Sequence, residues 1–184
     1  MARFSRASAI AFGAMMLVLS AMIAVETLVR KLFSVSLGGV DELSGYAIAI
    51  GAPLAFTVAL VEQSHIRINI LHMNMPTRLQ AVLNVIAALL LAALAIFLLV
   101  FTFRTVRETQ LYQSIAQTPW ATPLIWPQSI WLVAMSVFSG AAVFLAARAL
   151  WLALRGDWQA LNRSFGPDSV EEELKAELQD LARR

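Results

Sequence analysis

A chain of 184 residues is long enough for one ordinary domain, but its composition excludes an ordinary soluble one. Hydrophobic residues make up 59% and charged residues 14%, against roughly half and a quarter in average soluble domains. With a mean hydropathy of +0.71, part of the apolar surface must face lipid. The net charge of +2 gives no support for nucleic-acid binding, and the absence of cysteine excludes disulfides, thiolate zinc sites and cysteine nucleophiles.

Four apolar stretches are long enough to cross a hydrocarbon core, which takes about 20 helical residues. We therefore expect an all-α membrane protein with a four-helix transmembrane domain over residues 1–155 and a charged cytoplasmic tail over residues 156–184. The first apolar stretch is longer than the roughly 7 to 15 residues of a cleavable signal, so we interpret it as an uncleaved anchor. The predicted spans are residues 7–29, 43–61, 81–103 and 126–151.

The second and fourth spans carry further signals. Pro53 lies inside the second span and predicts a kink, because proline removes a backbone donor and clashes with the preceding turn. Trp126 and Trp151 lie at the ends of the fourth span, as expected for side chains at a membrane interface.

Lys and Arg residues near the span ends predict the orientation. Cytoplasmic loops carry an excess of these residues, so we expect both the N-terminus and the C-terminus in the cytoplasm. Seven basic residues lie on the side of the termini and four on the other: Arg3, Arg6, Arg67, Arg78, Arg148, Arg155 and Arg163, against Arg30, Lys31, Arg104 and Arg107.

Glu26 is the one acidic residue within the predicted spans. An ionisable group at membrane depth is a functional candidate by default. Arg30 follows four residues later, which is the favourable order for an ion pair within a helix. Pairing with Arg30, contact with another subunit and ion relay all remain open for this residue.

The acidic pair Asp41 and Glu42 opens the second span. Carboxylates at a helix start satisfy free backbone N–H groups, so capping explains both residues. An acid/base site would need a partner base, and none is identifiable. The functional alternative is an extracytoplasmic docking edge shared with Arg30 and Lys31.

The two histidines, His65 and His72, lie in the connection between the second and third spans. Haem sites in helix bundles need histidines on facing helices, so their position does not favour haem or metal binding. Apolar and polar residues alternate over residues 66–75, which predicts a strip lying among the lipid headgroups.

The connection before the fourth span is rich in proline. Pro119, Pro123 and Pro127 hold the preceding residues extended, which predicts a stiff strap. The strap is either a simple return to the membrane or a rigid protein-binding surface that presents Trp120 and Trp126.

The tail places apolar residues on one face of a predicted helix over residues 170–181, with Ser169 and Glu172 as a capping box. This amphipathic helix is either a solvated tail or a docking segment. No nucleophile elbow, phosphate-binding loop, zinc motif or dinucleotide fingerprint occurs, so the sequence predicts no enzyme, no cofactor and no metal.

Three sequence blocks follow one another along the chain: residues 40–46 (VDELSGY), 65–71 (HIRINIL) and 117–128 (QTPWATPLIWPQ). In this order they resemble the small membrane subunit of TRAP transporters, the DctQ-like family (tripartite ATP-independent periplasmic). The resemblance extends over about residues 8–152 and implies an accessory role in uptake of an organic acid, driven by an ion gradient. It implies two partners, a large elevator-type membrane subunit and a periplasmic substrate-binding protein, and an inner-membrane location.

On this interpretation the chain is a scaffold, and its candidate residues are interface residues. Two alternatives remain. One is an independent homo-oligomeric transporter or channel lined by Glu26, and the other is a membrane haem protein that uses His65 and His72. The candidates for subunit contact or docking are Glu26, Arg30, Lys31, Asp41, Glu42, His65, Arg67, Pro119, Trp120, Pro123, Trp126 and Pro127.

Overall fold

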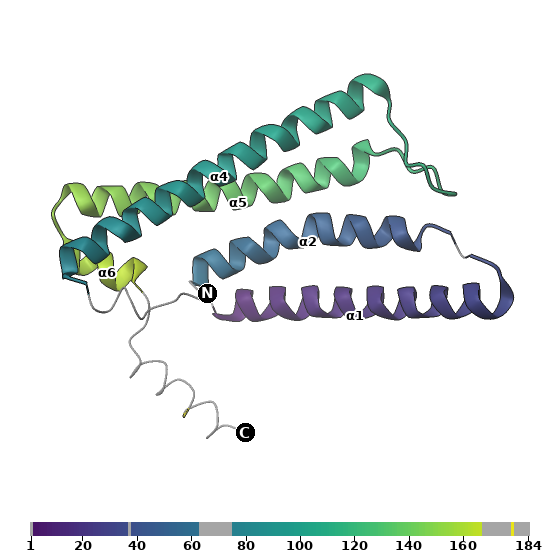
Figure 1. Cartoon of the computed structure of the whole chain (residues 1–184), viewed down its shortest axis with the longest axis horizontal. Helices are drawn as coiled ribbons and strands as arrows, with labels where there is room; N and C mark the ends of the chain where they lie inside the picture. Colours follow the sequence, from purple (N-terminus) through teal and green to yellow (C-terminus); the bar gives the residue numbers. More distant parts are fainter. Residues whose placement is uncertain (1, 37, 63–74, 167–177, 179–184) are drawn as a thin grey trace. The chain divides into compact units, whose positions relative to one another are not determined.

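Long helices dominate the computed structural model (Figure 1). It describes residues 2–36, 38–62, 75–166 and 178, with only the backbone for residues 2–9 and 11. In this part of the chain four helices are long and apolar enough to cross a membrane, which confirms the predicted fold class. The helices are α1 (Ala2–Phe33), α2 (Val40–Glu62), α4 (Thr77–Tyr112), α5 (Ile125–Leu154) and the short α6 (Trp158–Phe165).

Each long helix extends past its predicted span, and α4 does so most. Its 36 residues correspond to about 54 Å at about 1.5 Å per residue, against a hydrocarbon core of about 30 Å. The predicted span ended at residue 103, where apolar residues give way to polar ones. Residues 104–112 contain no Gly or Pro, so nothing ends the helix there.

The surface of the four long helices is mostly apolar and exposed. Leu17, Leu90, Phe97 and Phe144 each leave more than half of their surface uncovered. A soluble protein of this size would bury such side chains, whereas a membrane protein offers them to lipid or to another helix.

The chain divides into two compact units, which we describe separately. The first contains α1, α2, α4 from Ala92 onward and α5 up to Ala142. Within it α1 and α2 are in contact, and Gly51 leaves the space that the Phe12 ring occupies. The α4 and α5 segments are joined where Ser139 Oγ donates a hydrogen bond of 2.9 Å to the Ala95 carbonyl.

Helix α2 continues through Pro53, which is buried. The Thr57 hydroxyl donates to the Pro53 carbonyl at 2.8 Å, so a side chain adds a hydrogen bond in the turn after the proline. The kink expected at this position stays a prediction.

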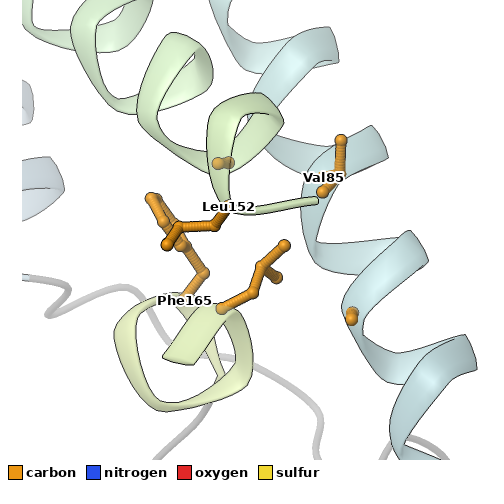
Figure 2. Close-up of a cluster of buried hydrophobic side chains, with 6 residues drawn as sticks. Val85, Leu152 and Phe165 are labelled. Carbon is orange, nitrogen blue, oxygen red and sulfur yellow. The ribbon is translucent and has the colours of Figure 1, made fainter. Parts of the chain in front are cut away.

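The second unit contains α4 up to Leu91, α5 from Val143 and α6. Figure 2 shows its hydrophobic cluster, which contains Val85 of α4, Leu152 of α5 and Phe165 of α6. Leu161 of α6 is completely buried in the same cluster.

Helix α6 lies in the part of the chain that we expected to be charged tail, and it was not predicted. Asp157 caps its start by accepting a hydrogen bond of 3.0 Å from the Ala160 N–H. Trp158, Leu161 and Phe165 share one face at spacings of three and four residues. The helix predicted over residues 170–181, with its capping box, falls outside the described residues except for Leu178, which is helical.

Candidate docking site

The connection between α1 and α2 turns through three left-handed residues. Ser34 ends α1 with a φ of 53°, and Gly38 and Gly39 have φ values of 64° and 77°. Glycine adopts this region without steric cost, which explains two consecutive glycines just before α2.

The strap, residues 113–124, forms a small hairpin between α4 and α5. Ile115 and Pro123 face each other in an antiparallel bridge. The Ala116 N–H donates to the Thr122 carbonyl at 2.9 Å, and the Ala121 N–H donates to the Thr118 carbonyl at 3.0 Å. The strap is therefore held by backbone hydrogen bonds of its own in addition to its prolines.

The strap lies directly against the glycine turn. A Cβ built on Gly38 would come within 3.2 Å of Pro119, and one built on Gly39 would overlap the Trp120 indole. Gly39 thus meets two requirements, a left-handed backbone and space for an aromatic ring. We call the set Gly38, Gly39, Glu42, Thr118, Pro119 and Trp120 the strap junction.

Glu42 ties the strap to the first turn of α2. Its carboxylate accepts a hydrogen bond from the Thr118 hydroxyl and another, of 2.8 Å, from the Tyr46 hydroxyl. The residue is 7% exposed. We expected Glu42 to cap its own helix or to form a docking edge; the bond from Thr118 also joins two segments 76 positions apart in sequence.

Glu26 forms the predicted ion pair with Arg30, at 2.7 Å between Arg30 Nη2 and Glu26 Oε1. Ser36, which sequence reasoning missed, also donates a hydrogen bond to the same oxygen, at 2.6 Å. Glu26 is buried, and its carboxylate joins α1 to the turn that follows it. Arg30 also lies 3.8 Å from Asp41, whose side chain is 85% exposed, so the ion pairs extend to the start of α2.

The remaining candidates differ in exposure. Lys31 is exposed, Trp120 and Trp126 are 51% and 70% exposed, and Pro123 is exposed. Pro127 is partly buried in the first turn of α5, where a missing N–H leaves no helical bond unmade. His65 and Arg67, together with His72, lie outside the described residues.

This arrangement suits binding of a protein better than chemistry. The carboxylates of Glu26 and Glu42 are occupied by neighbours, and the described residues contain no group of acids or histidines that could hold a metal ion. Two indoles and an exposed carboxylate remain available on the strap and at the helix ends next to it. Aromatic side chains of this kind often contribute most to a protein interface.

Together the fold and the strap junction define a class, a multi-pass membrane protein of four apolar helices. The family described as tripartite ATP-independent periplasmic transporters, DctQ component, matches residues 19–156, and the chain belongs to this family. The family is a transporter component and not an enzyme family, and its tripartite organisation implies partners within the complex. The match covers the glycine turn, α2, α4, the strap and α5, and it ends before α6. A search of curated proteins gave no match to the chain.

Proposed function

We propose that this chain is the small scaffold subunit of a transporter in the inner membrane, where it supports uptake of an organic acid driven by an ion gradient. A large elevator-type subunit carries the substrate and ion sites, and a periplasmic protein delivers the substrate. The observation that carries the proposal is the family match over the four long helices. The use of an ion gradient and the direction of transport are what the family resemblance implies.

The polar groups buried in the described helices support a scaffold role. A pathway for an ionic solute needs polar groups that converge at membrane depth. Here the Thr102 hydroxyl donates to its own helix, at the Leu98 carbonyl, and the Ser139 hydroxyl joins two helices. Glu26 is bonded to Arg30 and Ser36. These groups stabilise the helices, whose exposed apolar faces offer packing surface to a larger partner.

Co-purification and uptake test this role. The chain is expressed with a tag beside a large membrane subunit and a binding protein of the same family of transporters, sought among the neighbouring reading frames. We expect the large subunit to co-purify, and we expect cells that lack only this chain to lose uptake and to regain it when the chain is restored. Normal uptake without the chain would contradict the proposal.

The docking face proposed on this subunit consists of Trp120, Trp126, Asp41, Arg30 and Lys31. Trp126→Ala should weaken co-purification of a partner, because a largely exposed indole is lost without disturbing a buried contact. Trp151→Ala is the matched control, since Trp151 is 50% exposed at the opposite end of α5.

Charge reversal at Asp41 tests the same face. Asp41→Lys should weaken the complex while the subunit remains folded, because this carboxylate is exposed. The matched reversal Glu42→Lys should instead open the strap junction, since its carboxylate is bonded internally. If Asp41→Lys and Trp126→Ala both formed the complex normally, this face would not be the docking surface.

A further inference from the structure

An open groove lies beside the start of α4, within the second unit. It has a cavity volume of about 710 Å³, within the roughly 300 to 1,000 Å³ of typical ligand sites. We call it the α4–α6 groove. Its apolar wall is formed by Pro76, Leu79, Val82 and Trp158, and its polar rim by Arg78 and Gln159.

The α6 side of the groove is firmly positioned. Leu161 and Phe165 are buried in the cluster shown in Figure 2. Asn162 adds two hydrogen bonds, donating to the Thr77 carbonyl at 2.9 Å and accepting from Asn84 Nδ2 at 3.1 Å. Trp158, one turn before these residues, therefore forms a fixed wall. Trp158 lies outside the family match, which ends at residue 156.

Among the described residues that line the groove, Arg78 carries the one charge, and it is positive. The described part of the second unit contains four arginines and one acid, and that acid, Asp157, caps α6. Arg78 is exposed, and no ion pair joins it to another described residue. The arginines are Arg78, Arg148, Arg155 and Arg163, of which Arg155 stacks on Trp151 at 3.6 Å.

The groove lies where α4 enters its apolar stretch. Leu79 and Val82 are each 44% exposed within the first two turns of the helix, and Trp158 lines the same groove. Tryptophan is enriched at the boundary between lipid headgroups and hydrocarbon, and basic residues at that boundary attract anionic lipids. The apolar wall suits an acyl chain, and the positive charge of Arg78 suits an anionic headgroup. A lipid at the membrane boundary has both parts.

We infer that the α4–α6 groove binds one anionic phospholipid. Arg78 takes the phosphate, and the wall formed by Leu79, Val82 and Trp158 takes the first part of an acyl chain. The site anchors this end of the subunit to the membrane, and α6 completes it.

Lipid titration of the purified full-length chain tests the inference. Native mass spectrometry measures retention of phosphatidylglycerol and phosphatidylcholine by the protein in neutral detergent. We expect phosphatidylglycerol to bind more tightly, and Arg78→Gln to weaken it about fivefold, since one basic residue near a membrane surface contributes about 1 kcal/mol. Arg107→Gln is the matched control, because Arg107 is exposed near the other end of the same helix and should leave binding unchanged.

A second variant tests the apolar wall of the groove independently of the charge of Arg78. Val82→Trp fills the apolar wall but keeps Arg78, so it should also displace the lipid. Equal retention by the wild type, Arg78→Gln and Val82→Trp would overturn the inference. Equal binding of the two lipids, or displacement of phosphatidylglycerol by inorganic phosphate at equal concentration, would overturn it as well.

Cross-linking identifies the occupant directly. Since the chain has no cysteine, Leu79→Cys carries a photoreactive group at a single position. A covalent lipid adduct formed in vesicles that contain phosphatidylglycerol supports the inference. An adduct formed only with a peptide of this chain, or of a second copy, overturns it.

Discussion

The strap junction and the α6 cluster hold connecting segments in opposite ways. At the strap junction, polar groups join segments distant in sequence: a carboxylate binds a threonine and a tyrosine hydroxyl, and a glycine makes room for an indole. At α6, apolar side chains from three helices bury one another. Hydrogen bonds fix direction, whereas apolar packing depends mainly on volume. We therefore expect the strap junction to loosen when a single hydrogen-bonding group is changed. We expect the α6 cluster to lose stability when a buried side chain is made smaller.

The largest effect is expected for Leu161→Ala in the α6 cluster. Deletion of a completely buried leucine side chain costs about 2 to 5 kcal/mol, because a cavity remains. Hydrogen exchange should show faster opening of α6. The control Leu154→Ala, at a residue 80% exposed, should change stability by less than about 0.5 kcal/mol. Equal protection of α6 in the two variants would contradict the account of this cluster.

Gly39→Ala should destabilise the strap junction by a smaller amount. A left-handed backbone costs a residue with a Cβ about 1 to 2 kcal/mol, and here the Cβ must also displace Trp120. Gly156→Ala is the matched control, because Gly156 has a φ of 70° with no atom near its Cβ position. Denaturant unfolding should show a larger loss for Gly39→Ala, and equal losses would mean that the indole contact contributes nothing.

Removal of one hydroxyl or one charge tests the hydrogen bond between Thr118 and Glu42 directly. Thr118→Val and Glu42→Gln should each loosen the strap without a global loss of structure, since both keep the shape of the side chain. Limited proteolysis within residues 113–124 should then be several-fold faster. Asp41→Asn, next to Glu42 but exposed, is the control and should cleave at the wild-type rate. Unchanged cleavage in both variants would show that the hydrogen bond between Thr118 and Glu42 does not hold the strap in place.

The smallest effect is expected for Glu26→Gln in the assembled transporter. Gln keeps an oxygen that accepts from Ser36 and Arg30, so uptake should stay close to that of the wild type. Expression and co-purification of the variant are the controls. Loss of flux from a normally assembled complex would instead support the channel alternative, in which Glu26 lines a pathway.

The four long helices and the Glu26–Arg30 pair were predictable because they depend on local sequence. Apolar length sets a span, and a separation of four residues brings two side chains together on one helix. The helices extend past the predicted spans because hydropathy marks the membrane, whereas a helix continues until its backbone is interrupted. Helix α6 had a readable signal in Asp157 and the spacing of Trp158, Leu161 and Phe165, but the charge around it led us to expect a tail.

The strap junction was not predictable in its details. Glu42 and Thr118 are 76 residues apart, and no local pattern connects them. The glycine pair and the prolines indicated a turn and a stiff segment, but not that Trp120 lies on Gly39. The family match confirms the resemblance carried by the three blocks, two of which contain residues of this junction.

The most direct test of the central claim, that this chain supports transport without performing it, is uptake into proteoliposomes. Vesicles contain the chain alone, the large subunit alone or both, with the binding protein and labelled organic acids outside and a sodium gradient across the membrane. The account predicts no uptake by the chain alone and full uptake only when both subunits are present with the binding protein. Saturable, gradient-dependent uptake by this chain alone would contradict it.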